Sequence, residues 1–507
     1  MTAITIDSFQ WWLSNDRNIG QKWAFWKSDW VEIRKNSQYV TLNRALQTTD
    51  EQSNTFADIG NHKPVVMNFY GNWAATVSSF KELLVFTSDW YIYDRTWMTY
   101  DLSATDGISN FAIANWVKYI LGNSKLFTFT NKTTVSASLW NLTSNIYLRP
   151  WIDFYWDLIF WDGKQVGRYN KDGTLILYSS STENPVIWGL DGNVFAITRI
   201  WPNIYVWCND CADTLNPNWK NTNLYVWDWV SSRPIQKITY TDKPVINVAL
   251  LWASHYWWSQ KSVNAMKNIF IGESYQPTRY VTSNIPNSLS TGADNDQNIL
   301  GLYGAWTNAI ETVGDIVYIP WYWRVFWFGK YFPESKFILN REFTFSGSEC
   351  TAMLSGEVTP NSVDCTNQLF IAYNNGSNNY KVGYYDFRDY NGLYTSSGYI
   401  ESMEYVSNWL LLGEDQNKFI IPFELTNSAC TITVSVQIDR SGSYTAIKTI
   451  NSTDYWTWFT TAELKNVGKW DVIQFRFDLA TSNTTYSPKL RVGMTNQSSA
   501  VWNLARR

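Results

Sequence analysis

The thiols are the first side chains whose spacing could bind a metal. Cys208 and Cys211 form a C-x-x-C pair in WCNDCAD, which is half of the ligand set of a typical zinc site. The other three of the five cysteines are scattered, and neither histidine stands at ligand spacing from a further candidate. We therefore predict no metal site and no cofactor, and we interpret Cys208 and Cys211 as reduced thiols in a loop.

General acid–base catalysis would depend on the two histidines or on paired carboxylates. His62 lies in the loop-like stretch GNHKP and His255 in the aromatic run ASHYWW, and we interpret both as structural. The chain has no G-x-S-x-G nucleophile motif, phosphate-cradling loop, EF-hand or dinucleotide fingerprint, and no good copy of the sialidase Asp box. These absences argue against the common hydrolase and nucleotide-binding classes.

Two carboxylate pairs remain as candidates for acid–base chemistry, namely Asp153 with Asp157 and Glu311 with Asp315. Acidic residues beside β-hairpins commonly cap turns, and sequence spacing alone cannot place two carboxylates across a cleft. We therefore predict no catalytic residues and no enzymatic activity. The alternative function is a polysaccharide-degrading propeller, a glycoside hydrolase or lyase whose acid pairs only the fold would bring together.

Short β-strands are the elements that must position these side chains. A polar residue, often Asn or Asp, is followed repeatedly by three or four β-branched or aromatic residues and a turn. If NLYVWDW belongs to the same unit as NIYVWCND, the steps between the copies are roughly 30 to 65 residues. Helical periodicity is almost absent. We predict a β-propeller of about six or seven blades over residues 61–390, with an irregular array of β-sandwiches as the alternative. The copies are KELLVFTSDW (81–90), SKLFTFTN (124–131), DLIFWDG (157–163), NIYVWCND (203–210), NLYVWDW (223–229), NIFIGES (268–274), DIVYIPWYW (315–323) and NQLFIAYNNG (367–376).

The two ends of the chain have a different texture. Residues 1–60 are interpreted as an extended N-terminal arm with one or two strands and no core of its own, which would pack on a partner or on the next domain. Residues 391–507 include TITVSVQID (431–439), which alternates as a half-buried antiparallel strand does, followed by a DRSG turn. We predict a C-terminal β-sandwich of jelly-roll type here, so the whole protein is all-β.

Charge and hydropathy narrow the set of partners. The net charge is −4, and no Lys/Arg run is longer than the terminal pair, so we predict no nucleic-acid partner. The longest apolar stretches, such as VINVALLWA (245–253), are far shorter than the roughly 20 residues of a membrane helix, so we predict no membrane insertion. The start of the chain has no secretory signal pattern, which favours synthesis in a cytoplasm.

Tryptophan stands where turn chemistry favours glycine. SDWYIYD (88–94) has Trp90 at the turn, whereas the similar stretches NKDGTLILY and GLDGNVFAI have Gly173 and Gly192. In the strand repeat, NIFIG ends in Gly272 and NIYVW in Trp207. The chain has 31 tryptophans among 507 residues but only 26 glycines, below the roughly 7% expected. The repeated exchange of these two residue types requires an explanation.

Genetic code reassignment is one hypothesis: UGA codons written as Trp would be read as Gly in the native host. The further slots that this hypothesis covers are occupied by Trp161, Trp227 and Trp229. The rival interpretation is functional, with clustered Trp and Tyr forming stacking platforms for sugar rings or bases. The first hypothesis predicts that no single tryptophan should be taken as a binding residue.

With both ends placed, the chain resembles a loosely defined group of tailed-phage virion proteins with an N-terminal arm, a β-propeller and a C-terminal sandwich. The resemblance is carried by SDWVEIRKNSQYVTL (28–42), the propeller strands and YTSSGYIESMEY (394–405). It implies a tail-associated structural protein, located in the virion and assembled in the host cytoplasm. The implied partners are other virion proteins, a host-surface glycan and further copies of the chain.

Overall fold

The protein is represented by a computed structural model that describes strands and their connections along most of the chain. Described residues are 25–29, 31–32, 39–42, 58–70, 82–94, 99–101, 107–131, 134–136, 138–143, 149–177, 187–209, 221–240, 245–251, 254–259, 262–267, 278–281, 310–313, 316–321, 324–329, 338–344, 349–356, 368–376, 379–386, 402–407, 410–411, 418–439, 441–453, 460–465, 472–491 and 495–496. Within these ranges, no helix is long and apolar enough to span a membrane.

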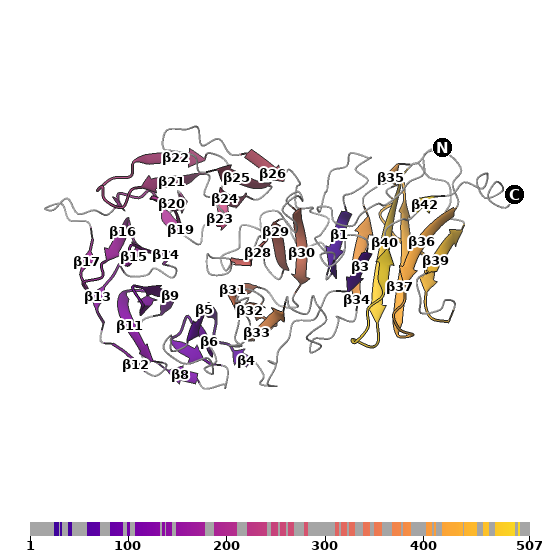
Figure 1. Ribbon diagram of the computed structural model, residues 1–507, viewed down its shortest axis with the longest axis horizontal. Helices are drawn as coiled ribbons and strands as arrows, with labels where there is room; N and C mark the ends of the chain where they lie inside the picture. Colours follow the sequence, from indigo (N-terminus) through magenta and orange to yellow (C-terminus); the bar gives the residue numbers. More distant parts are fainter. Residues whose placement is uncertain are drawn as a thin grey trace.

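Seven antiparallel sheets of the described chain stand around a common axis (Figure 1). Each sheet contains consecutive strands joined as a meander, and only the last sheet borrows a strand from elsewhere in the chain. This is a β-propeller, and the prediction of an all-β propeller followed by a sandwich is confirmed. NIYVWCND and NLYVWDW, treated as one unit in the sequence, pair as neighbouring strands of blade 4.

Blades 1 to 4 run from residue 64 to residue 240. Their strands are β5 (Pro64–Tyr70), β6 (Glu82–Thr87), β7 (Tyr91–Tyr93) and β8 (Thr99–Asp101); β9 (Ile108–Ala114), β10 (Val117–Gly122), β11 (Lys125–Asn131), β12 (Thr134–Val135) and β13 (Trp140–Asn141); β14 (Trp151–Phe154), β15 (Asp157–Asp162), β16 (Gln165–Tyr169), β17 (Leu175–Ile176) and β18 (Ile187–Trp188); and β19 (Asn193–Ile200), β20 (Asn203–Asn209), β21 (Thr222–Trp227) and β22 (Gln236–Tyr240).

Blades 5 to 7 complete the ring. Their strands are β23 (Val245–Leu251), β24 (Ser254–Ser259), β25 (Ser262–Lys267) and β26 (Thr278–Val281); β27 (Glu311–Val313), β28 (Ile316–Trp321), β29 (Arg324–Gly329) and β30 (Ile338–Thr344); and β31 (Cys350–Gly356), β32 (Gln368–Asn374), β33 (Tyr380–Asp386) and β4 (Asp58–Gly60). Because β4 precedes blade 1 and pairs with β33, it closes the ring by completing blade 7.

The propeller core lies between successive blades. All residues of β15 and β20 are buried, as expected for strands that are covered by neighbours on both faces. Ile159 of blade 3 and Val206 of blade 4 belong to one hydrophobic cluster, and Met67 of blade 1 and Phe370 of blade 7 belong to another. Since a single blade cannot bury both of its faces, stacking around the ring supplies the missing cover.

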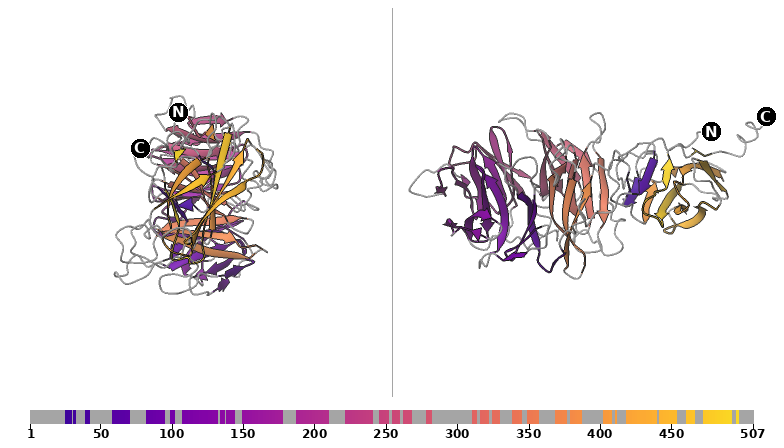
Figure 2. Two further views of the ribbon diagram at one scale, coloured as in Figure 1. Left: turned by 90° about the vertical axis from the view of Figure 1, so that its right-hand side faces the viewer. Right: turned by 60° about the horizontal axis from the view of Figure 1, so that its bottom comes forward.

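The sandwich consists of two six-stranded antiparallel sheets. Figure 2 shows the sandwich in front of the ring in its left view and beside the ring in its right view. In β40, alternate residues such as Phe475 and Phe477 point to the core, while Arg476 between them is partly exposed. One sheet contains β1 (Phe25–Asp29), β34 (Ser402–Ser407), β35 (Leu410–Leu411), β37 (Cys430–Ile438), β38 (Thr445–Ile450) and β40 (Val472–Thr481), and the other β2 (Val31–Glu32), β3 (Tyr39–Leu42), β36 (Lys418–Glu424), β39 (Thr460–Lys465), β41 (Lys489–Arg491) and β42 (Thr495–Asn496).

The predicted arm, residues 1–60, supplies strands to both bodies. Its described strands β1, β2 and β3 belong to the sandwich, where Val40 and Leu42 are fully buried, and β4 belongs to blade 7. The propeller is therefore an insertion between β3 and β34 of the sandwich. β1 also lies beside β30 of the ring.

Candidate functional site

The hairpin turns of blades 2 to 4 carry exposed aromatic side chains. Trp116 in the β9–β10 turn is 68% exposed, Tyr155 and Trp156 in the β14–β15 turn are 45% and 52% exposed, and Trp201 in the β19–β20 turn is 67% exposed. In a meander, the turn between the first two strands and the turn between the last two lie at the same end of the blade. Trp229, in the β21–β22 turn, therefore belongs to the same end. We call these five residues the aromatic turns.

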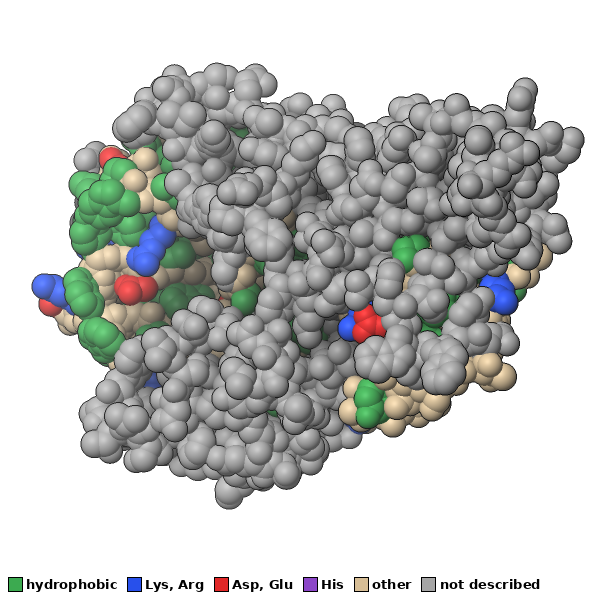
Figure 3. Space-filling view, turned by 45° about the vertical axis from the view of Figure 1, so that its right-hand side comes forward, with side chains coloured by type: hydrophobic (Ala, Val, Ile, Leu, Met, Phe, Trp, Pro, Cys, Tyr) green, Lys and Arg blue, Asp and Glu red, His purple; other side chains and the backbone are tan. Residues whose placement is uncertain are grey.

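Ring contacts connect the aromatic turns across three blades. The ring centroids of Trp116 and Trp156 are 6.4 Å apart, those of Tyr155 and Trp201 are 5.0 Å apart, and Trp229 stacks on Tyr155 at 4.8 Å. Figure 3 shows hydrophobic side chains gathered on the part of the propeller that lies away from the sandwich. Exposed aromatic groups of this kind are typical of binding surfaces, and sugar rings stack on them.

The backbone of two of these turns has the conformation that favours glycine. Asn115 and Trp116 have φ of 48° and 63°, and Tyr155 and Trp156 have φ of 51° and 71°. A two-residue hairpin loop with both φ values positive is a type I′ turn, for which Asn-Gly is the preferred pair. The bulky residue at each second position is held in a region that costs an L-residue roughly 1–2 kcal/mol.

Trp90 and Trp229 share this backbone property. Trp90 has φ of 75° and donates its N–H to the Thr87 carbonyl at 3.3 Å, whereas Gly173 has φ of 82° and donates to the Asn170 carbonyl at 3.0 Å. Trp229 has φ of 56°. The expectation from SDWYIYD that residue 90 takes a glycine-like conformation therefore agrees with the geometry.

Other tryptophans are embedded in strands and packed as core residues. Trp161 and Trp227 are buried, and their indole N–H groups donate to the carbonyls of Gly163 and Ser231. Trp207 is fully buried and stacks on Tyr240 with 6.2 Å between centroids. Gly272, with which the sequence comparison matched them, lies outside the described residues.

Asp153 and Asp157 are close in blade 3 but differ in environment. Asp157 is buried, pairs with Arg168 and accepts the Lys171 backbone N–H at 3.2 Å. Burial raises the pKa of Asp153, the nearby Arg199 lowers it in part, and the charge of Asp157 adds to the rise. Asp157 is thus committed to structural contacts, while Asp153 keeps a perturbed carboxyl on the innermost strand of the blade.

Glu311, the first residue of β27, is a second carboxyl of the ring whose pKa is raised. It accepts a hydrogen bond from the Ser355 hydroxyl of blade 7, and desolvation raises its pKa to about 7. A carboxyl that titrates near neutral pH is suited to proton transfer. Its proposed sequence partner, Asp315, lies outside the described residues.

The histidines and thiols form no described site. The His62 ring is hydrogen-bonded to the Asp89 carboxylate and packs at 4.3 Å from the Tyr91 ring. Cys208 lies in β20 and is fully buried, so its interpretation as a loop thiol is wrong. Burial raises the pKa of this thiol well above its usual range. Cys211 and the side chain of His255 lie outside the described residues. Among described residues, no group of three or more His, Cys, Asp or Glu could hold a metal ion.

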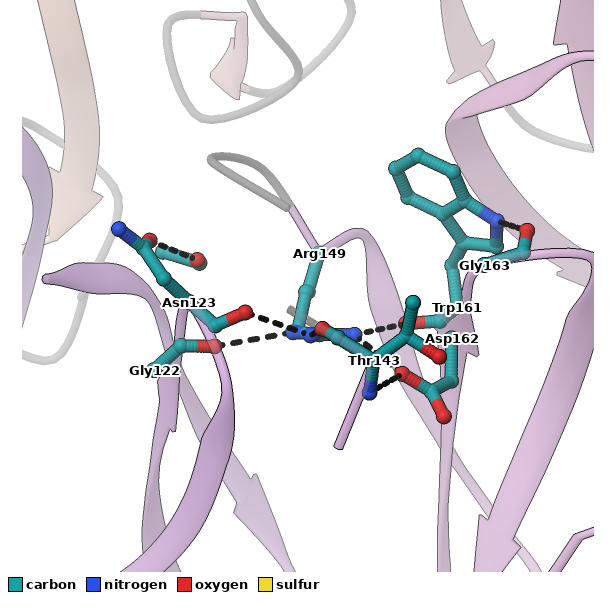
Figure 4. Close-up of polar contacts among 8 residues, drawn as sticks. Gly122, Asn123, Thr143, Arg149, Trp161, Asp162 and Gly163 are labelled. Atoms are coloured by element: carbon teal, nitrogen blue, oxygen red, sulfur yellow. Dashed lines mark hydrogen bonds and ion pairs between the residues drawn. The ribbon is translucent and has the colours of Figure 1, made fainter. Parts of the chain in front are cut away.

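Arg149 is a feature that the sequence analysis missed. Its side chain is 0% exposed, and Figure 4 shows its guanidinium between backbone carbonyls of blades 2 and 3 and the carboxylate of Asp162, which is 2% exposed. Such a cage requires contacts between segments that are distant in sequence, so no local pattern could reveal it. Its acceptors are the carbonyls of Gly122 (2.9 Å), Asn123 (2.9 Å), Trp161 (3.0 Å) and Thr143, and Asp162 Oδ1 (2.7 Å).

No protein-family model matches the chain, and no curated protein matches it. Similar solved structures include BBS1N in complex with ARL6DN (10% identity, 64% of this chain and 93% of that chain, TM-score 0.41) and the Pan2 WD40 domain of Neurospora crassa (7%, 64% and 89%, 0.41). BamB from Moraxella catarrhalis is also similar (10%, 60% and 81%, 0.34). These likenesses concern the fold and carry no argument about function.

Proposed function

We propose that the protein is a non-enzymatic structural component of a phage particle, associated with the tail. The supporting observation is how the ring uses its ionisable groups. Asp157 with Arg168, Asp162 with Arg149, and His62 with Asp89 are engaged in contacts within and between blades. A closed ring whose ionisable side chains are engaged in such contacts suits a rigid scaffold better than a reaction site.

The proposal includes location and partners. The protein resides in the virion after assembly in the host cytoplasm, where it contacts other virion proteins and further copies of itself. Adhesion to a host-surface glycan would use the rim of the propeller or a face of the sandwich. Neither nucleic acid nor membrane insertion has a part in this function.

Purified particles test the structural role directly. Peptides of this chain should remain with the particles through density-gradient purification and a high-salt wash. Host envelope polysaccharide mixed with the purified protein should show no release of reducing ends. Absence of the chain from intact particles, together with its presence in the infected-cell lysate, would contradict the structural proposal.

A polysaccharide-degrading activity is the second candidate, because Glu311 has a pKa of about 7 and Asp153 has a raised pKa in the same ring. If this activity exists, reducing ends should appear with native protein and be lost with Glu311→Gln. The matched control is Glu349→Gln, which alters a carboxylate of blade 7 that pairs with Lys63. Equal loss of reducing-end release in both variants would indicate damage to the ring.

Genetic code reassignment is also part of our proposal: UGA in this gene is read as glycine by the native host. The positive φ values of Trp90, Trp116, Trp156 and Trp229 support it, because glycine adopts this conformation without strain. A phage origin is consistent with such reassignment.

A further inference from the structure

We propose that the native polypeptide carries glycine at positions 90, 116, 156 and 229 and genuine tryptophan at positions 161 and 227. This inference rests on the proposed code reassignment and assigns it to individual residues by backbone geometry. It also bears on binding, because three of the four side chains that it removes belong to the aromatic turns.

The two type I′ turns provide the clearest case. With φ positive at both loop positions, Asn115 is a favoured first residue, since Asn tolerates this region, but Trp116 is among the worst second residues. Trp156 is equally unfavourable as a second residue, and Tyr155 before it also has positive φ. These side chains are mostly exposed, so little burial offsets the backbone strain. Glycine at positions 116 and 156 removes the strain at the second position of each turn, and Tyr155 keeps its positive φ.

Comparison between blades extends the argument to the other two positions. The β6–β7 turn contains Trp90 with φ of 75°, and the corresponding second-to-third strand turns of blades 3 and 7 contain Gly163 with φ of 66° and Gly376 with φ of 95°. The third-to-fourth strand turn contains Trp229 in blade 4, with φ of 56°, and Gly173 in blade 3, with φ of 82°. In both comparisons, glycine in one blade has the positive φ that tryptophan has in another.

Hydrogen bonding distinguishes Trp90 from the two tryptophans that we assign as genuine. The Trp90 side chain is buried in the core between blades 1 and 2, and its indole N–H has no hydrogen-bond partner among the described residues, a property that it shares with the buried Trp327. By contrast, the Trp227 N–H donates to the Ser231 carbonyl at 2.7 Å, and that of Trp161 donates to Gly163. Neither Trp161 nor Trp227 has positive φ, and both lie within buried strands.

The inference changes the candidate binding surface. Glycine at positions 116, 156 and 229 leaves Tyr155 and Trp201 as the remaining members of the aromatic turns, and it removes the stack of Trp229 on Tyr155. The apparent platform across three blades is then reduced to one pair of rings. Glycan binding by this protein would have to use other groups.

Tandem mass spectrometry of peptides from the native host tests the assignment without any folding requirement. We expect glycine at positions 90, 116, 156 and 229 and tryptophan at 161 and 227. Tryptophan at 116 or 156, or glycine at 227, would overturn it. Peptides from infected cells answer this question even if the chain is absent from particles, so failure of the virion role is distinguishable from failure of this inference.

Stability of recombinant variants provides the second test. Trp116→Gly and Trp156→Gly should raise the midpoint of thermal unfolding, by about 2 °C or more each. Trp227→Gly is the matched control and should lower it, because it empties a packed core position. A lower midpoint for the two turn variants would count against glycine at these positions.

Discussion

Replacing Arg149 by Met should destabilise the propeller at the junction of blades 2 and 3. The substitution keeps an unbranched apolar stem of similar length and removes the guanidinium. Asp162 then remains as a buried carboxylate that still accepts the Thr143 N–H at 2.8 Å but has lost its counter-charge. Four backbone carbonyls lose a donor at the same time.

The size of the effect follows from burial. Removing one partner of a fully buried ion pair costs about 3–5 kcal/mol, mainly because the other charge is left uncompensated. Each carbonyl that loses its donor would add about 1–3 kcal/mol if water could not reach it. Because local opening of the junction will admit water, we expect the total loss of stability to lie near the upper end of the range given for the ion pair. Arg149→Lys keeps the charge but not the planar fork and should lose less.

Urea unfolding, measured by hydrogen exchange of the amides in β10 and β15, reports on this junction without interference from the sandwich. The matched control is Lys237→Met, which breaks the exposed pair between Lys237 (41% exposed) and Asp191 (64% exposed). Such a pair is worth about 1 kcal/mol or less. In the double variant Arg149→Met/Asp162→Asn, part of the lost stability should return, because the uncompensated charge is gone.

A loss of less than about 1 kcal/mol in the free energy of unfolding of Arg149→Met would refute this reasoning, because breaking an exposed ion pair costs as much. The same conclusion would follow if Arg149→Met and the double variant were equally unstable. Either result would mean that the guanidinium is solvated or dispensable in the folded ring.

Three further predictions concern titration, thiols and topology. Desolvation raises the pKa of Glu311 from 4.5 to about 7, so protonation of this carboxyl stabilises the folded state fully below about pH 4.5, and this stabilisation is lost as the pH rises to about 7. Glu311→Gln should reduce the loss of stability across this pH range by roughly 1–3 kcal/mol, as measured by thermal melts. Burial raises the pKa of Cys208 and Cys350, so iodoacetamide should label neither thiol until urea unfolds the ring. A label on either cysteine, found by peptide mapping of native protein, would contradict this prediction. Deleting residues 1–42 removes β1, β2 and β3, so dye binding to exposed apolar surface and hydrogen exchange in β34 and β41 should both increase. Unchanged exchange would show that the three deleted strands are dispensable.

Local periodicity allowed the strand class and the propeller to be predicted, because each strand carries its alternation within a few residues. The TITVSVQID stretch and the buried run NIYVWCND are examples that form β37 and β20. The conformation of Trp90 was also accessible, since turn chemistry is local. By contrast, the Arg149 cage and the Glu311–Ser355 contact depend on blades meeting in space. No spacing along the chain encodes them.

The insertion topology distinguishes two versions of the structural role. The strands before the ring, β1 to β3, and those after it, β34 to β42, all belong to the sandwich. The chain enters the ring through β4 and leaves through β33, which are hydrogen-bonded neighbours in blade 7. A force that pulls on the sandwich would therefore load the sandwich strands, and it would not unfold the ring one blade after another. The structural role has two versions, a ring that is displayed to a partner and a ring that acts as a spacer in series, and a ring attached in this way is suited to display.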